Sequence, residues 1–113
     1  MTVVERLEAL TKAQADVDTA TYVDMRSGTV LCSSSGGEQP QEQLDALCET
    51  AKACLDSPVG QSNEAIIMKS TEVIYCVRST ANPVEALCLV CAPAVPVAEA
   101  AAWARNLVTD LRE

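Results

Sequence analysis

The chain has 113 residues, of which 49% are hydrophobic and 3% aromatic, and its formal net charge is −8. This length fits one domain with its own core, the apolar fraction argues against disorder, and the scarcity of aromatic rings argues against base stacking with single-stranded nucleic acid. The negative charge disfavours phosphate backbones and anionic membranes as partners, and it fits either a basic protein partner or general solubility.

Six cysteines are present, without a hydrophobic signal core at the start and without an apolar run of ~20 residues. We therefore expect a cytoplasmic protein whose reduced thiols act as small buried hydrophobes. Cys88 and Cys91 form a Cys-x-x-Cys pair inside an apolar segment with the pattern of a strand. Because strand residues three apart point to opposite faces, we expect neither a disulfide nor a zinc site from this pair.

The first third of the chain predicts a helix followed by a hairpin. Residues 2–14 have a capping-box start at Thr2 and an apolar stripe at helical spacing. Residues 19–25 and 29–33 have the pattern of two strands, and Gly28 can supply the positive φ of a tight turn between them.

The middle of the chain predicts a loop, a second helix and a linker. Residues 33–37 are Ser and Gly, which is typical of a loop. Pro40 suits the start of a helix because its missing N–H donor is not needed there, residues 56–58 end the helix, and residues 59–63 form the linker. The inward stripe of this helix is Leu44, Leu47, Cys48, Ala51, Cys54 and Leu55.

The last half of the chain predicts three strands and a third helix. Strands are expected at residues 64–69, 72–78 and 86–92, and the third is apolar on both sides, which predicts a central position covered on both faces. With a helix over residues 97–112, the order α-β-β-α-β-β-β-α predicts one α+β domain over residues 1–113, with an antiparallel sheet flanked by helices. The inward face of the last helix is Val97, Ala100, Ala101, Ala104, Leu107, Val108 and Leu111.

The sequence lacks the residue patterns of common catalytic sites. It contains no histidine, which is the commonest general base and a favoured metal ligand. The segments RSGTV and SSSGGE do not have the spacing of a phosphate-binding loop, and no Gly-x-Ser-x-Gly nucleophile elbow is present. We therefore predict no enzymatic activity, no cofactor and no metal site.

Five segments follow one another in a recognisable order and, with the last helix, cover nearly the whole chain. They are VVERLEALTKA, TYVDMRSGTVLCSSS, QEQLDALCETAKACLD, EAIIMKSTEVIYCVRST and VEALCLVCAP. In this order they resemble the Roadblock/dynein light-chain family. The family's hairpin often has an acidic residue just before the turn glycine, whereas this chain has Ser27 there and Asp24 further back.

The resemblance implies a Roadblock/profilin-like fold. Its sheet has five antiparallel strands in the order 2-1-5-4-3, with the first and last helices on one face and the middle helix on the other. Members of the family dimerise through the middle helix and the third strand. They bind or regulate small Ras-like GTPases or serve as motor and scaffold subunits, and bacterial members include a GTPase-activating protein for a motility GTPase.

The residues themselves also favour a homodimer. In the implied sheet order, the strand over residues 64–69 lies at an edge, with Ile66 and Met68 on one face and Ile67 on the other. An exposed apolar edge is a pairing hazard that a partner strand removes. The outer side of the middle helix carries small residues, which either let a second helix approach or form a plain solvent face. The residues predicted at the dimer interface are Ala46, Thr50, Ala53, Ile66, Ile67 and Met68.

Three further residues are candidates for contact with a partner. Trp103 is at the edge of the inward stripe of the last helix, where it is either a margin of the core or an interface anchor. Arg26 and Arg78 lie in or near predicted turns, although neither is a specific candidate for an arginine finger.

Three functions remain open from the sequence. The first is a non-catalytic homodimeric adaptor that binds a small Ras-like GTPase and acts as a scaffold or a GTPase-activating partner. The second is a scaffold or motor-complex subunit without effect on nucleotide turnover. The third is a small-molecule sensor, which would need a concave pocket with converging polar groups that these apolar strands do not suggest.

Overall fold

A computed structural model describes residues 2–34, 41–57 and 60–111. The predicted order of three helices and five main strands is confirmed, and a short two-stranded ribbon replaces the linker predicted at 59–63. Pro40, most of the loop at 33–37, and residues 58–59 lie outside the described residues. The elements are α1 (Val3–Ala13), β1 (Val17–Asp24), β2 (Thr29–Ser33), α2 (Gln41–Leu55), β3 (Asp56–Ser57), β4 (Gly60–Gln61), β5 (Glu64–Met68), β6 (Val73–Arg78), β7 (Glu85–Cys91) and α3 (Val97–Asp110).

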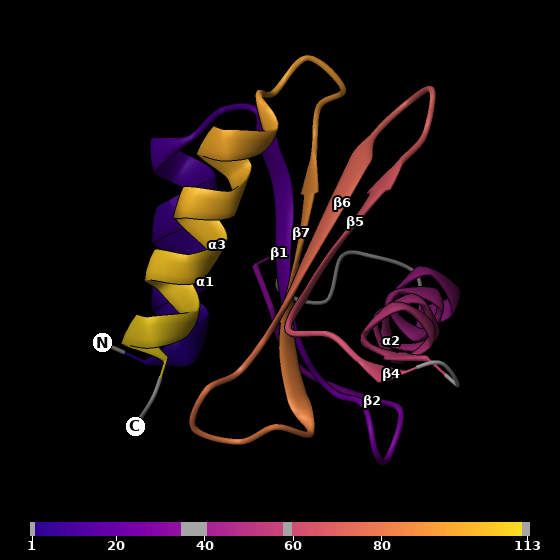
Figure 1. Ribbon diagram of the computed structural model, residues 1–113. Helices are drawn as coiled ribbons and strands as arrows, with labels where there is room; N and C mark the ends of the chain where they lie inside the picture. Colours follow the sequence, from indigo (N-terminus) through magenta and orange to yellow (C-terminus); the bar gives the residue numbers. More distant parts are fainter. Residues whose placement is uncertain (1, 35–40, 58–59, 112–113) are drawn as a thin grey trace.

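The main sheet has five antiparallel strands in the order β2-β1-β7-β6-β5. This is the order that the family resemblance implied. The apolar strand β7 lies at the centre, as predicted, and β5 lies at one edge. Figure 1 shows α1 and α3 side by side on one face of the sheet and α2 on the other.

The two faces of the sheet form two cores, because alternate residues of each strand point to opposite sides. Leu87, Leu89 and Cys91 of β7 pack in the core under α1 and α3. Ala86 and Cys88 of the same strand pack in the core under α2. All five side chains have no exposed surface, so β7 is buried from both sides.

Two local signals in the sequence set the ends of the first elements. The side chain of Thr2 accepts a hydrogen bond from the Glu5 N–H at 3.2 Å, and the Glu5 carboxylate accepts one from the Thr2 N–H at 3.1 Å, which completes the capping box. Gly28 has a φ of 71° in the turn between β1 and β2. The Asp24 carboxylate, at the end of β1, accepts hydrogen bonds from the backbone N–H groups of Arg26 and Ser27 and so holds the turn that directly follows it.

One residue of the predicted inward stripe of α3 does not face the core. Val97 is 44% exposed, whereas the other six residues of that stripe are buried. The reason is its position: Val97 is the first residue of α3, and it follows the exposed Pro93, Ala94 and Pro96 of the β7–α3 connection.

Arg78 at the end of β6 is buried, which corrects its prediction as a partner contact. Its side chain is 7% exposed. The guanidinium donates hydrogen bonds to the backbone carbonyls of Leu55, Ser62 and Pro83, and it forms an ion pair with Asp56 at 2.6 Å. Arg78 thus ties the end of α2, the β3–β4 ribbon and the β6–β7 loop together, and its charge is not available to another protein.

Replacement of this clamp should destabilise the fold. We expect Arg78→Met to lower the free energy of unfolding by about 3 kcal/mol, because it leaves buried carbonyls and the Asp56 carboxylate without their donor. Arg26→Met, at an exposed turn position, is the matched control and should change that free energy by less than about 0.5 kcal/mol. Urea titration measures both, and equal stability of the two variants would contradict the clamp.

Candidate functional site

The outer edge of β5 is an open side of the sheet. Within the described ranges, β5 pairs with β6 and no strand of the chain pairs with its other side. Ile66 is 36% exposed and Met68 70% exposed. A strand edge with unused backbone donors and acceptors and apolar side chains is a site for pairing with another chain.

The three predicted residues of β5 divide between the two faces. Ile67 is half-buried and packs, with Ala65, against the core under α2. Ile66 and Met68 share the opposite face with Glu64, whose carboxylate reaches α3. The edge strand therefore offers an apolar residue to a partner on both faces.

The outer side of α2 lies beside the same end of the sheet. Ala46 and Ala53 are exposed and Thr50 is half-buried. Ala46 and Thr50 line a groove of about 240 Å³ that they share with Lys69 and Glu72 of the β5–β6 turn. The structure thus brings the two elements predicted for dimerisation next to each other.

The remaining predicted contact residues are not brought together. Trp103 is half-buried against the core under α1 and α3, and it lines a groove of about 340 Å³ between these helices with Leu10 and Leu107. Arg26 is exposed in the turn between β1 and β2. Trp103 therefore lies at the margin of the core and also lines a surface groove, and its role as an interface anchor stays a prediction.

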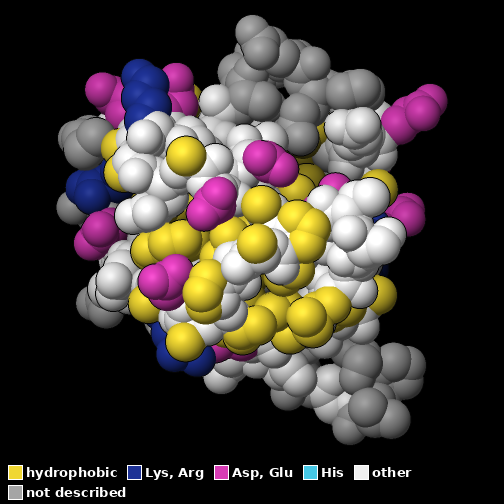
Figure 2. Space-filling model, turned by 90° about the horizontal axis from the view of Figure 1, so that it is seen from above, with side chains coloured by type: hydrophobic (Ala, Val, Ile, Leu, Met, Phe, Trp, Pro, Cys, Tyr) yellow, Lys and Arg dark blue, Asp and Glu magenta, His cyan; other side chains and the backbone are white. Residues whose placement is uncertain are grey.

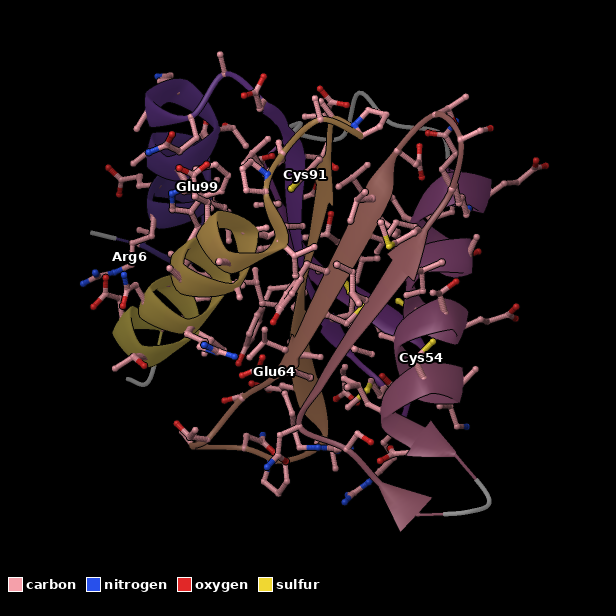
Figure 3. All side chains as sticks on the ribbon, turned by 45° about the horizontal axis from the view of Figure 1, so that its top comes forward. Arg6, Cys54, Glu64, Cys91 and Glu99 are labelled. Atoms are coloured by element: carbon pink, nitrogen blue, oxygen red, sulfur yellow. The ribbon has the colours of Figure 1, made fainter. Side chains whose placement is uncertain are left out.

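A polar network at the start of β5 was not predicted from the sequence. The Glu64 carboxylate accepts two hydrogen bonds from the Arg105 guanidinium, at 2.7 and 2.8 Å, and one from the Tyr75 hydroxyl at 2.6 Å. Glu64 lies on the side of the sheet that faces α3 (Figure 3). Arg105 lowers the pKa of Glu64 by hydrogen bonding, and burial together with Glu64 raises the pKa of Tyr75. No local pattern in the sequence could reveal a pair 41 residues apart.

The cysteines are arranged as the strand pattern predicted, with one addition. Cys88 lies in the core under α2 and Cys91 in the core under α1 and α3, so the Cys-x-x-Cys thiols diverge. Figure 3 shows Cys54 on α2 and Cys91 on the other side of the sheet. The addition is that Cys76 and Cys88 are opposite each other in β6 and β7, with 3.6 Å between their Sγ atoms. The sequence contained both residues, but their pairing depends on the strand register.

Both buried positions disfavour the reactive thiolate. The hydrogen bond between the Cys88 and Cys76 thiols and then burial raise the pKa of Cys88, and burial raises the pKa of Cys91 to about 11. All six cysteines are free thiols.

Across residues 2–34, 41–57 and 60–111, no group of three or more cysteine or acidic side chains is placed to hold a metal ion. No helix within those ranges combines the length and the apolar character needed to cross a membrane.

Comparison with known proteins identifies the fold. Neither a protein-family model nor a curated protein matches the sequence. Solved structures do match: a Roadblock/LC7 domain from Streptomyces avermitilis has a TM-score of 0.77 at 12% identity, over 99% of this chain and 96% of that one. MglB from Myxococcus xanthus has a TM-score of 0.77 at 10% identity, over 97% and 91% of the two chains. Profilin IB from Acanthamoeba castellanii has a TM-score of 0.67 at 13% identity, over 98% and 97%.

These similarities define the class of the fold. The chain has the Roadblock/LC7 fold, which profilins share in its general form, and the resemblance seen in the sequence is confirmed at that level. The identities are low, so the comparisons describe architecture.

The thiols provide a test of the two cores. In the native protein at neutral pH, we expect a thiol reagent to label the half-exposed Cys32 and Cys54 first. Cys88 and Cys91, with no exposed surface and raised pKa values, should react only as fast as the protein unfolds. Mass spectrometry of the labelled protein measures this order, and denatured protein, in which all six should react, is the control. Rapid labelling of Cys88 or Cys91 would refute their burial.

The Glu64–Arg105 ion pair gives a pH-dependent prediction. Because Arg105 lowers the pKa of Glu64 below 4.5, the pair contributes to stability at higher pH and loses that contribution as the pH falls through the lowered pKa. Glu64→Gln should therefore reduce the free energy of unfolding by up to about 1 kcal/mol at neutral pH, since the pair is partly solvated. The difference from wild type should shrink in acid. Glu8→Gln is a control without this ion pair, and a difference for Glu64→Gln that persists unchanged at acid pH would contradict the assignment.

Proposed function

We propose that this chain is a non-catalytic, cytoplasmic adaptor that forms a homodimer and binds a small Ras-like GTPase, as a scaffold or as a GTPase-activating partner. The observation that carries the proposal is the open edge of β5 beside the exposed small residues of α2. A second copy of the chain has the same edge and the same helix side, so a two-fold axis at β5 satisfies both at once.

Pairing of two β5 strands would extend the sheet and give the open edge its missing hydrogen bonds. The side chains of Ile66, Ile67 and Met68 would gain apolar neighbours from the second copy. On the α2 face, Ala46 and Ala53 would let the two α2 helices approach closely, because neither has a side chain beyond Cβ. Thr50 would lie between them.

The GTPase is proposed as partner because of the Roadblock resemblance and the similarity of fold to MglB. The mechanism would be positional: the dimer would hold the switch regions of the GTPase and order catalytic groups that belong to the GTPase. Burial of Arg78 leaves Arg26 as the exposed arginine of the two that the sequence raised. Support for the cytoplasmic location comes from the six cysteines, all of which are free thiols and none of which is in a disulfide.

A scaffold or motor-complex subunit without effect on nucleotide turnover is the second candidate. This candidate uses the same dimer surface as the GTPase-binding adaptor, so the structure supports both equally. Only a measured effect on GTP hydrolysis distinguishes them. A sensor for small molecules is the third. Its support is weak, because the groove between α1 and α3 has an apolar wall of Ala9, Leu10, Trp103 and Leu107, and its polar lining residues are Arg6, Asn106 and Asp110.

A pair of matched variants tests the dimer. We expect sedimentation at micromolar concentration to show a dimer for the wild type. Ala53→Arg should weaken dimerisation by at least roughly tenfold, ~1.4 kcal/mol, because a long charged side chain would separate the two α2 helices. Ala102→Arg makes the same change at an exposed position of α3, and it should leave the dimer intact. A wild-type monomer, or equal behaviour of the two variants, would count against the proposed interface.

A single-turnover GTP hydrolysis assay tests the proposed GTPase partner. A small Ras-like GTPase from the same organism, loaded with GTP, should bind the wild-type dimer and bind Ala53→Arg more weakly. Faster hydrolysis in the complex would identify an activating partner, and unchanged hydrolysis with binding would identify a scaffold. Absence of binding to the GTPase would contradict this half of the proposal.

A further inference from the structure

Two buried thiols face each other in the middle of the sheet. Cys76 of β6 and Cys88 of β7 are opposite each other in the strand register, with 3.6 Å between their Sγ atoms. Neither side chain has exposed surface, and both lie in the core under α2. The two thiols are therefore in direct contact, in contrast to Cys88 and Cys91, which lie in different cores.

A buried hydroxyl lies beside this pair of thiols. Thr21 of β1 is opposite Cys88 in the register, so Thr21, Cys88 and Cys76 form one row across three strands. The row is on the α2 face of the sheet, because Val23, two residues after Thr21, belongs to the core under α2. Thr21 has no exposed surface, and its hydroxyl oxygen has no hydrogen-bond partner among the described residues. A buried polar group in this condition is costly and requires an explanation.

A surface groove comes within one row of the thiols. The groove of about 240 Å³ between α2 and the β5–β6 turn is lined on the sheet side by Ile74 and Val90. Ile74 is two residues before Cys76 and Val90 is two residues after Cys88, so both are in the next row on the same face of the sheet. Figure 2 looks onto the end of the molecule where the β5–β6 turn lies, and hydrophobic side chains reach the surface there. A small solute in the groove is thus separated from the thiols by one row of side chains.

We propose that Cys76 and Cys88 form a redox-sensitive site, at which a small hydroperoxide joins the two thiols in a disulfide between β6 and β7. The thiolate of one cysteine attacks the O–O bond, which gives a sulfenic acid and, after protonation, one water. The second thiol attacks the sulfenic sulfur, the S–S bond forms, and a second water leaves. In total the two thiols lose two electrons and two protons, and the peroxide is reduced to two waters. The site is independent of the proposed homodimer and of the GTPase.

Thr21 supports the charged form of Cys88 in this reaction. A thiolate is a strong hydrogen-bond acceptor, and the Thr21 hydroxyl beside it has a donor that nothing described in the reduced protein uses. The hydroxyl therefore gains its missing partner when Cys88 loses its proton. Burial and the raised pKa of Cys88 keep the thiolate rare, so the oxidation is slow, and hydrogen peroxide reaches the pair more easily than a bulkier alkylating reagent.

The disulfide should also be easy to reduce, because it must form between facing residues of a packed sheet. Such residues have Cβ atoms about 4.5–5.5 Å apart, whereas a disulfide favours about 3.8 Å. Closure of the bond therefore draws β6 and β7 together beneath Cys48, Ala51 and Leu55 of α2, which pack in the same core. A strained disulfide is a labile one, so a cytoplasmic thiol such as glutathione should reopen it.

Oxidation of the full chain followed by mass spectrometry tests the site. The folded protein is treated with hydrogen peroxide at neutral pH, the remaining thiols are alkylated in denaturant, and trypsin is added without reduction. Trypsin cuts after Lys69, Arg78 and Arg105, so Cys76 and Cys88 fall in the separate peptides 70–78 and 79–105. Because Cys91 shares the second peptide, the protein carries Cys91→Ala. Linked peptides 70–78 and 79–105, two hydrogens lighter than their sum, should be the main disulfide product, and glutathione should remove the link.

A matched pair of variants tests the role of Thr21. Thr21→Val should slow formation of the link by about fivefold, the effect of one hydrogen bond to a charged group. Thr19→Val removes the other buried hydroxyl without a described partner, which is opposite Val90 and not a thiol, and it should leave the rate unchanged. Each rate is divided by the rate at which an alkylating reagent labels Cys88, which corrects for any change in opening of the core. Equal corrected rates for the two variants would remove Thr21 from the site.

The oligomeric state is controlled separately. Ala53→Arg, which should open the proposed self-contact beside the groove, should form the link at least as fast as the parent protein. If peroxide oxidises Cys32 and Cys54 but links peptides 70–78 and 79–105 in neither protein, the redox site is overturned, whether the chain is a dimer or a monomer. A main product that links Cys54 to either peptide would overturn it as well. Formation of the expected link in a protein that sediments as a monomer would uphold the redox site and contradict only the homodimer.

Discussion

Burial of β7 from both sides is the constraint on which the rest of the structure depends. A strand with Leu87 and Leu89 on one face and Ala86 and Cys88 on the other must lie inside a sheet that has helices on both faces. β1 and β6 take the positions beside it, and β2 and β5 are left at the edges. The same constraint that makes the interior compact therefore leaves β5 with an open side.

The two faces of β5 are covered unequally. On the α2 face, Ile67 is part of a core, and the neighbouring small residues of α2 offer a surface suited to an identical copy. On the opposite face, α3 reaches β5 only at the Glu64 end, and Met68 is left exposed. One strand thus contributes its edge to a proposed self-contact, while the opposite face keeps Ile66 and Met68 exposed.

Patterns within one element were enough to predict most of the fold. The capping box at Thr2, the turn at Gly28 and the apolar run of β7 each depend on residues close together in sequence, and each is found where it was expected. The β3–β4 ribbon was missed because each of its strands is only two residues long, and Arg78, which donates to the carbonyls of Leu55 and Ser62 on either side of it, lies far from it in the sequence. Val97 was assigned to the core because helical periodicity gives its direction and not where the helix begins relative to the sheet.

The candidate site was predictable in part for the same reason. The sequence and the family resemblance identified β5 and α2, since edge position and small residues follow from order and composition. The sequence placed Ile66 and Met68 on one face of the strand and Ile67 on the other. Which face lies under α3 follows only from the structure, in which Glu64, on the same face as Ile66, contacts Arg105 of α3. The facing thiols of Cys76 and Cys88 likewise required the register of two strands.

The most direct test of the account is amide hydrogen exchange in β5 as a function of protein concentration. If two copies pair through this edge, peptides covering Glu64–Met68 should be protected at high concentration and should exchange faster on dilution, while peptides from the central strand β7 remain protected throughout. Exchange in β5 that is independent of concentration, with its outer amides as fast as those of an exposed turn, would contradict the pairing on which the proposed function depends.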